Sequence, residues 1–335
     1  MACATIASNG GGETALPNAA AGPFREATSR ELPGRAAPFA LRNDDEFDRD
    51  VSVVDQDNDE ATVPAFVFAA RTNFSEDVDS DASAPSNAIV RFVAPDGRTP
   101  DRQFTPVYEP TAPWEGEHVG APAGLWSSRS PVGAPLPADA LLLFYEAEGG
   151  IGVLVEGEPV EGPVLAPAES GWDVDQVPRS PAPYIDAAGE LRLLYVADLP
   201  DGRPAIGEAV ADGTSLVRRA EPVLQGSEDR DPGGVDGPAA VAATTAIGRD
   251  VTYLYYGGIE ADGSRSIGLA ARFFDGQPFT KAPSPVLRTD DLPREPWVVR
   301  GDGFSVLYVT SDAGTSGSFP GVLVGVAPAD ISLAP

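Results

Sequence analysis

The hydrophobic positions of this chain fall into short runs, rich in β-branched and aromatic residues, that recur in a constant order. One unit is complete between Asp231 and Leu287, where Gly, Pro and Asp-Gly separate four such runs. Runs of this length, joined by turn-forming residues, predict four antiparallel strands. Because one such sheet is one blade of a β-propeller, the unit predicts a propeller blade.

The second and third runs of the unit each occur five times, always in the same order. The second run lies at 66–68, 143–145, 194–196, 254–256 and 306–308. The third run, which reads Ile-Gly in three of its copies, lies at 89–90, 151–152, 206–207, 267–268 and 324–325. A period of about 60 residues indicates repetition of one supersecondary unit around an axis.

The fourth run, typified by Pro-Val-Leu, predicts how the ring closes. It lies at 38–41, 106–108, 163–165, 222–224 and 285–287, so its first copy precedes every other element and the last unit has none. Residues 36–41 are therefore expected to pair as the outer strand beside residues 321–327, which protects an open sheet edge. The sequence predicts an all-β, five-bladed β-propeller with four-stranded antiparallel blades, in which an N-terminal strand closes the last blade.

The domain organisation follows from the same repeat. Residues 1–35 are expected to form a flexible tether, since their first part is small, polar and unpatterned. Residues 36–330 are expected to form one propeller domain, and the 36 Gly and 34 Pro suit a chain of many short strands. The expected blades span 50–109, 118–166, 177–225, 235–288, and 294–327 plus 36–41.

The charge of the chain excludes one class of partner. With 51 acidic and 23 basic residues, the formal charge is −28, which repels nucleic acid and anionic membranes. Such acidity is typical of a solvated surface, and cation binding is the alternative reading. The alternating acids Asp55, Asp57 and Asp59 are typical of a calcium loop, but Glu60 stands where that loop needs glycine. We therefore expect no cofactor, and calcium is the weaker alternative.

The single cysteine, Cys3, excludes an internal disulfide framework. Its place at the start of the tether resembles the mature start of a bacterial lipoprotein, in which the cysteine carries the lipid. The alternative is an ordinary cysteine in a disordered terminus. No apolar stretch approaches the ~20 residues of a membrane span. We expect an extracytoplasmic bacterial protein, either secreted or tethered to the cell surface through Cys3.

Candidate site residues lie just ahead of the five inner strands, because the ends of these strands converge on the axis of a propeller and form a funnel. They are Arg49, Asp50, His118, Gly120, Arg179, Ser180, Asp231, Asp236, Arg294 and Glu295. Random surface acidity could supply the carboxylates, whereas three arginines at repeated positions indicate a function. Arg179 and Arg294 are expected to stabilise the ionised forms of Asp236 and Glu295. A lone histidine such as His118 is more often a hydrogen-bonded structural residue, and the alternative is an axial cation site.

The repeated unit, with Leu-Tyr-Tyr in its second strand and Ile-Gly-x-Ala in its third, resembles the five-bladed propeller of glycoside hydrolase families 43, 32 and 68. The resemblance covers residues 36–330 and implies a pair of catalytic carboxyl groups. Carried over by position, it places the base at Asp50 and the acid at Asp236. Val51 replaces the family's proline after the base, and Ser180 stands where a carboxylate that tunes the acid is expected.

The aromatic residues at 144, 145, 195, 253, 255, 256 and 308 lie on second strands and are expected to be buried in the core, whereas another aromatic is a candidate platform for a sugar ring. Trp297 follows Glu295-Pro296 at the start of an inner strand, so it is either a stacking surface for a ligand or part of the core. The leading hypothesis is a carbohydrate-active propeller that binds a glycan in its funnel with weak or no hydrolysis. The alternative is a structural module of the cell surface that binds another protein. The departures at Ser180 and Asp236 favour the alternative, whereas Asp50, the arginines and Trp297 favour glycan binding.

Overall fold

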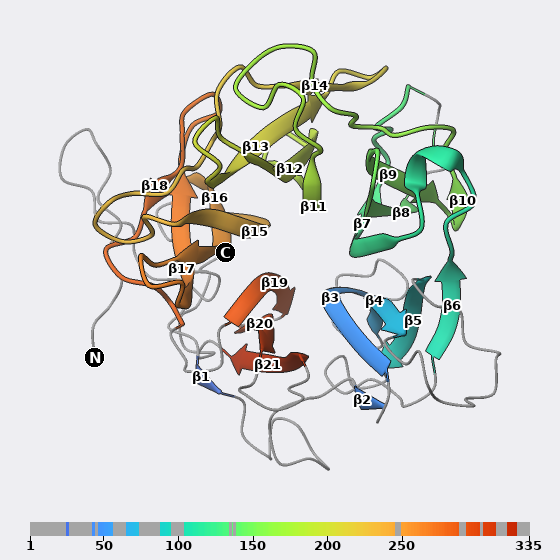
Figure 1. Cartoon of the computed structure of the whole chain (residues 1–335), viewed down its shortest axis with the longest axis horizontal. Coiled ribbons are helices and arrows are strands. Elements are labelled where there is room, and N and C mark those ends of the chain that lie inside the picture. Colours follow the sequence, from blue (N-terminus) through green and yellow to red (C-terminus); the bar gives the residue numbers. More distant parts are fainter. Residues whose placement is uncertain are drawn as a thin grey trace.

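The recurring apolar runs form antiparallel sheets around one axis in the structure, which is a computed structural model of the whole chain (Figure 1). It describes residues 25–26, 42–43, 46–55, 65–73, 88–94, 104–133, 136, 139–244, 249–287, 293–301, 304–312 and 320–326. For β1, β2, β20, β21 and parts of several other strands, only the backbone is described.

Five sheets are present in the described part of the chain. The first contains β2 (Arg42–Asn43), β3 (Glu46–Asp55), β4 (Ala65–Asn73), β5 (Ala88–Ala94) and β6 (Phe104–Tyr108). The second contains β7 (Val119–Ser127), β8 (Ala140–Ala147), β9 (Gly150–Val155) and β10 (Glu158–Pro159). The third contains β11 (Arg179–Ile185), β12 (Leu191–Asp198), β13 (Pro204–Ala211) and β14 (Leu216–Arg218). The fourth contains β15 (Gly234–Thr244), β16 (Asp250–Ile259), β17 (Arg265–Arg272) and β18 (Thr280–Lys281). The last contains β19 (Pro293–Gly301), β20 (Phe304–Asp312), β21 (Pro320–Val326) and β1 (Arg25–Glu26).

The inner strands of these sheets surround the axis. Each of β3, β7, β11 and β15 contacts the next inner strand, and β19 contacts β3, so that the ring closes (Figure 1). Four sheets have four antiparallel strands, and in the first sheet β2 adds a fifth strand beside β3. The prediction of an all-β propeller with four-stranded antiparallel blades is thus confirmed.

The Ile-Gly repeat of the third strands has a steric cause. In three sheets the glycine lies opposite a tyrosine of the second strand, in the pairs Tyr145 with Gly152, Tyr195 with Gly207, and Tyr256 with Gly268. A Cβ atom on these glycines would lie only 2.2–2.4 Å from the tyrosine Cζ. Since real contacts are far longer, only glycine leaves room for the ring. The tyrosines are buried, as the sequence pattern predicted for the aromatic residues of second strands.

The Pro-Val-Leu runs do not form the outer strands of the middle sheets, contrary to the sequence prediction. The outer strands there are β10, β14 and β18, and each Pro-Val-Leu run makes one isolated bridge to the third strand. These bridges join Ile151 to Leu165, Ile206 to Leu224, and Ile267 to Leu287. Proline has no N–H to donate to a ladder, which limits the pairing of such a run. In the first sheet the corresponding run does lie in the outer strand, β6.

An N-terminal strand does pair with the last blade, at residues other than those predicted. It is β1, in which Arg25 pairs with Val326 and Glu26 with Gly325 of β21. It therefore lies within the segment that the sequence suggested to be a tether. The predicted closing strand, residues 36–41, lies outside the described residues. The edge of β21 is thus covered by a shorter strand than the sequence indicated.

The only helical element within the described ranges is a 3-10 turn, η1 (Pro113–Glu115), in the loop before β7. No helix in this part of the chain has the length and apolar character needed to cross a membrane.

Candidate functional site

All five inner strands interrupt their pairing at the same level around the axis. The register of each against its second strand shifts once, and the residues in the shifts are Asp50-Val51, Ala121-Pro122, Ser180-Pro181, Gly237-Pro238 and Glu295-Pro296. A bulge of this kind bends the strand and re-aims the neighbouring side chains. The residues directly before these shifts, Arg49, Gly120, Arg179, Asp236 and Arg294, are therefore structurally equivalent from blade to blade.

The first residue of three of these bulges has a positive φ angle. The φ angle is 43° at Ala121, 49° at Ser180 and 50° at Gly237, in a region that only glycine adopts freely. Such a conformation costs of order 1–3 kcal/mol at a residue with a side chain, and it clusters at sites that bind ligands. The strain at Ala121 and Ser180 therefore marks the level of the bulges as the candidate site.

The residue before each bulge pairs with a residue of the second strand, and each of these pairs has one charged member. The pairs are Arg49 with Ala70, Gly120 with Glu146, Arg179 with Val196, Asp236 with Gly257, and Arg294 with Thr310. We call these ten residues the funnel tier. In chain order the charged members are Arg, Glu, Arg, Asp and Arg, and the last and first arginines belong to neighbouring blades. Three arginines and two carboxylates thus occupy equivalent backbone positions at this level, in a chain whose formal charge is −28.

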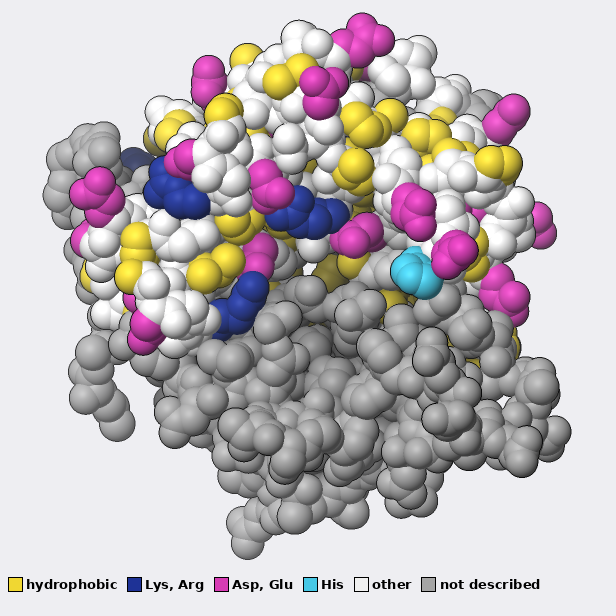
Figure 2. Space-filling model, viewed as in Figure 1, with side chains coloured by type: hydrophobic (Ala, Val, Ile, Leu, Met, Phe, Trp, Pro, Cys, Tyr) yellow, Lys and Arg dark blue, Asp and Glu magenta, His cyan; other side chains and the backbone are white. Residues whose placement is uncertain are grey.

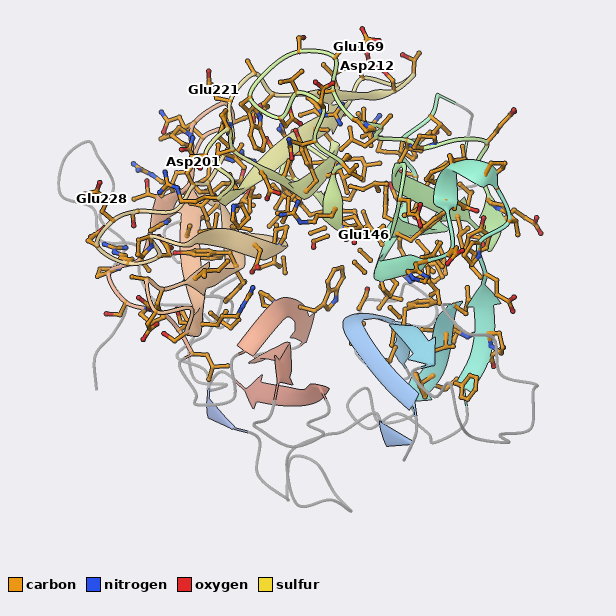
Figure 3. The ribbon with its side chains drawn as sticks, in the orientation of Figure 1. Glu146, Glu169, Asp201, Asp212, Glu221 and Glu228 are labelled. Carbon is orange, nitrogen blue, oxygen red and sulfur yellow. The ribbon has the colours of Figure 1, made fainter. Side chains whose placement is uncertain are left out.

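Glu146 is a site residue that the sequence reasoning missed. Its Oε2 accepts a hydrogen bond of 2.8 Å from the Ser180 N–H of the next blade, and Figure 3 shows its side chain near the centre of the ring. A signal was present, because Glu146 follows the repeated tyrosine of its strand, where the other blades with that tyrosine have Val196 and Gly257. A charged residue at a repeated apolar position is a candidate for function.

Asp236 lies within the funnel tier and is held by an arginine. Arg265 Nη1 donates to both of its carboxylate oxygens, over 2.9 and 2.7 Å, and both side chains are mostly buried. The paired residue on β16, Gly257, makes this possible, since a Cβ there would lie 2.3 Å from Asp236 Oδ1. Asp236 is therefore an ion-paired hydrogen-bond acceptor.

Arg179 has a partner that differs from the one expected. From the sequence, Arg179 and Arg294 were expected to stabilise Asp236 and Glu295. The structure instead pairs Arg179 Nη2 with Asp198 Oδ1 over 2.5 Å, and about a third of each side chain is exposed. The acid lies on the neighbouring strand β12, so the arginine reaches it without crossing to the next blade. Because the arginine is partly exposed, some of its guanidinium donors remain accessible to a ligand.

Ser180 and its equivalents Asp50 and Glu295 are bulge residues rather than members of the funnel tier. The backbone N–H of Ser180 donates a hydrogen bond to Glu146. The backbones of Arg49, Asp50, Arg294 and Glu295 take the expected positions in β3 and β19. Their side chains lie outside the described part of the structure.

Asp231 does not belong to the funnel. It is almost fully buried and accepts hydrogen bonds from Ser227 N over 2.7 Å and from Lys281 Nζ over 2.5 Å. It lies in the loop before β15 and also forms a hydrogen bond with Tyr256 of β16. Its spacing from Asp236 placed it near the inner strand in the sequence, but the loop turns away from the axis. Asp231 is therefore a structural carboxylate at the junction of two blades.

Trp297 joins inner strands across the ring. Its indole Nε1 donates a hydrogen bond of 2.9 Å to the carbonyl oxygen of Val53 on β3. The same side chain packs against the buried cluster of the second and third blades, which includes Leu142 and Leu193. Trp297 is only partly buried, so part of its surface remains exposed. Of the two readings of the sequence, these contacts support the packing role.

His118 is exposed, just before β7. Among the described residues, no group of three or more His, Cys, Asp or Glu side chains lies close enough to hold a metal ion. The alternating acids at 55–59, where calcium was the weaker alternative, fall outside these residues, apart from the backbone of Asp55.

Chemically, the site offers arginine donors and carboxylate acceptors around one axis. Figure 2 shows basic and acidic side chains gathered beside the hollow at the centre of this face. Such a mixture suits a ligand with many hydroxyl groups, each of which both donates and accepts.

Comparison with known proteins identifies the fold. Neither the scan against protein-family models nor the search of curated proteins found a match. Among solved structures, a thermostable family-43 glycoside hydrolase is similar, with a TM-score of 0.59 and 16% identity over 86% of this chain and 92% of that one. An α-L-arabinofuranosidase from Podospora anserina has a TM-score of 0.58 and 15% identity over 88% and 96% of the chains. An endo-arabinase from Bacteroides thetaiotaomicron has a TM-score of 0.55 and 13% identity over 87% and 97%. At these identities the likeness shows a shared propeller fold.

Proposed function

We propose that the central funnel binds a polar glycan and that hydrolysis there is weak or absent. The observation that carries this proposal is the funnel tier, in which arginines and carboxylates occupy equivalent positions at one level of the axis. The proposal takes the first sheet, with its extra strand, as the fifth blade. The similar folds of named glycoside hydrolases support a saccharide as the ligand class.

The engagement of the described carboxylates argues against efficient hydrolysis. A glycosidase needs one carboxyl group that gives a proton to the leaving oxygen and a second that acts as base or nucleophile. Asp236 is ion-paired with Arg265, and Glu146 accepts the Ser180 N–H. Both groups act as acceptors, so proton donation by either would first break an existing interaction. Ser180 supplies no carboxylate to help.

The same proposal includes the location expected from the sequence. A glycan-binding propeller outside the cytoplasm would meet polymeric glycans, and Cys3 would provide its anchor. Metabolic labelling with a fatty-acid analogue, compared between the wild type and Cys3→Ser, tests the anchor independently of glycan binding.

Titration calorimetry with arabino-, xylo- and fructo-oligosaccharides tests the proposal. We expect binding to at least one of them, weakened about tenfold by Glu146→Gln, which corresponds to ~1.4 kcal/mol. Asp201→Asn is the matched control, because Asp201 is an exposed acid paired with Arg203 away from the funnel. Reducing-end assays on the same sugars should show little or no turnover.

Two results would count against this assignment. Failure of every saccharide to bind would favour the alternative of a protein-interaction module. Turnover at an ordinary enzymatic rate, lost in Asp236→Asn or Asp50→Asn, would show that the carboxylates are catalytic.

A further inference from the structure

The loop that leads into the second blade inserts a tryptophan and a carboxylate against a buried tyrosine. Trp114 stacks on Tyr145, with ring centroids 6.2 Å apart and planes 26° apart. The hydroxyl of Tyr145 donates a hydrogen bond of 2.6 Å to Glu115, the residue after the tryptophan. An indole ring thus fills the space beside the tyrosine at this junction.

The next junction repeats this arrangement. Trp172 stacks on Tyr195 with centroids 6.1 Å apart and planes 20° apart, and Tyr195 donates to Asp173 over 2.8 Å. Here a cation completes the group, because Arg218 Nε lies 3.0 Å from Asp173 Oδ2 and its guanidinium lies 5.5 Å from the Tyr195 ring centroid. Tryptophan, carboxylate, tyrosine and cation therefore form one unit.

At the junction before the fourth blade, every member of this unit is retained except the tryptophan. Tyr256 hydrogen-bonds to Asp231, and Lys281 takes the place of the cation, 2.5 Å from Asp231 Oδ1 and 5.5 Å from the Tyr256 ring centroid. The residue before the carboxylate is Arg230. It stands as many residues before its bulge proline, Pro238, as Trp114 stands before Pro122.

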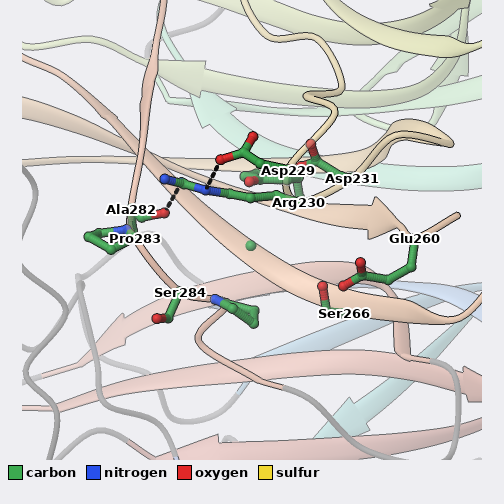
Figure 4. Close-up of a pocket in the computed structure, with 11 residues that line it drawn as sticks. Asp229, Arg230, Asp231, Glu260, Ser266, Ala282, Pro283 and Ser284 are labelled. Carbon is green, nitrogen blue, oxygen red and sulfur yellow. Dashed lines mark hydrogen bonds and ion pairs between the residues drawn. The ribbon is translucent and has the colours of Figure 1, made fainter.

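A cavity of about 280 Å³ is present at this junction. It is lined by Tyr256, Gly268, Arg230 and Pro283 among others, and Figure 4 shows the labelled side chains around it. The Arg230 side chain does not fill it, because the guanidinium turns to the carbonyl oxygen of Ala282 and to Asp229. The cavity therefore borders the tyrosine that an indole ring covers in the other two blades.

The wall of the cavity sets the charge of a suitable ligand. Asp229, Asp231 and Glu260 are acidic, and Ser266 adds a hydroxyl. Arg230 pairs with Asp229 and Lys281 pairs with Asp231, so the three carboxylates and two cations together carry an excess negative charge. Prolines 283 and 285 add an apolar surface. A volume near the lower end of the ~300–1,000 Å³ typical of small-molecule sites suits a single ring system. Acidic walls around an aromatic floor favour a cation over an anion.

We propose that this cavity is a second ligand site, which binds an aromatic ring bearing an ammonium group in the place that tryptophan occupies at the other junctions. The site is separate from the funnel and independent of its ligand. Tyr256 and Gly257 are consecutive in β16, so their side-chain positions lie on opposite faces of the sheet. The cavity borders Tyr256, whereas Asp236 of the funnel tier packs over Gly257.

Tryptamine is the probe, because it combines the indole of the other junctions with an ammonium group. Ligand-observed NMR and titration calorimetry should show saturable binding to the full chain, at least tenfold tighter than binding of indole-3-acetate, which has the same ring and the opposite charge. Arg230→Trp should place an indole in the cavity and weaken tryptamine binding at least tenfold, without lowering the melting temperature. Arg230→Ala is the matched control and should retain binding.

The proposal is overturned if tryptamine does not bind, if it binds no tighter than indole-3-acetate, or if the folded Arg230→Trp variant binds it as the wild type does. Should Arg230→Trp fail to fold, Glu260→Gln gives the decision. This variant should reduce the preference for tryptamine over indole-3-acetate, and an unchanged preference would contradict the proposed role of the acidic wall.

Discussion

Arg265 holds Asp236 through one guanidinium nitrogen, Nη1, which lies 2.9 Å from one carboxylate oxygen and 2.7 Å from the other. The two residues are on different strands of the fourth blade, β17 and β15. Only 16% of the arginine side chain and 22% of the aspartate side chain are exposed. Partial burial limits solvent screening, so this ion pair is expected to matter more than one at the open surface.

A double-mutant cycle with Asp236→Asn and Arg265→Gln measures this pair. We expect a coupling of about 1 kcal/mol in the free energy of unfolding, at the upper end of values for partly exposed pairs. The matched control is the pair of Asp201 and Arg203, which is 2.7 Å long but about half exposed. Its coupling should be close to zero. Equal coupling in the two cycles would show that burial does not strengthen the funnel pair.

Trp297 is expected to stabilise the ring more than it binds ligand. Trp297→Ala removes its packing against the second and third blades and should cost about 3 kcal/mol, the lower part of the range for buried tryptophans. Trp297→Phe keeps a ring but loses the hydrogen bond to Val53, which should cost ~1 kcal/mol. Urea unfolding measures both. A Trp297→Ala variant with unchanged stability and lost glycan binding would instead make Trp297 a ligand platform.

Glu208 is a buried carboxylate between the third and fourth blades. Its side chain is fully buried, and it accepts hydrogen bonds from Tyr184 over 2.6 Å and from Arg272 over 2.7 Å. Arg192 and Arg219 also contact it. Burial by itself would raise the pKa of Glu208, but the hydrogen bonds and charge of Arg272, with the other donors, hold the pKa below its ordinary value.

The lowered pKa of Glu208 predicts a loss of stability in acid. A carboxyl group whose pKa is lower in the folded state stabilises the fold above its unfolded pKa of about 4.3, and this contribution disappears as the pH falls through the folded value. Glu208→Gln should cost about 3–5 kcal/mol at pH 7, since buried arginines lose their partner. The cost should begin to shrink as the pH falls below the unfolded pKa of about 4.3. Urea titrations from pH 7 to pH 3 test this, with Glu190→Gln as an exposed control, and a pH-independent cost would contradict it.

The N-terminal strand β1 is expected to stabilise the last blade although it is only two residues long. Deleting residues 1–28 removes its pairing with β21 and exposes that edge, so the melting temperature should fall. Deleting residues 1–20 leaves β1 in the chain and should change the melting temperature little. Calorimetric scans of both truncations decide between these outcomes. Equal melting temperatures would show that β1 adds no stability.

Much of the fold was predictable because its cause is local. Strand length, turn residues and the alternation of apolar positions are properties of neighbouring residues, and the repeat therefore predicted the second and third strands of each sheet. The position of the bulges was also predictable from neighbouring residues, since four of the five contain a proline, which lacks the N–H needed for ladder pairing. Arg179 and Asp236 could be placed at equivalent positions for this reason.

The partners of these residues depended on contacts between segments far apart in the chain. Glu146 reaches Ser180 in the next blade, and Arg265 rather than Arg179 holds Asp236, because the twist of each sheet and the course of each loop decide which side chains approach. The same holds for the pairing of β1 with β21. The repeat in the sequence determined the order of the strands and the faces of their side chains. The cavity beside Tyr256 depends on the tertiary structure, which places Arg230 where the other junctions have a tryptophan.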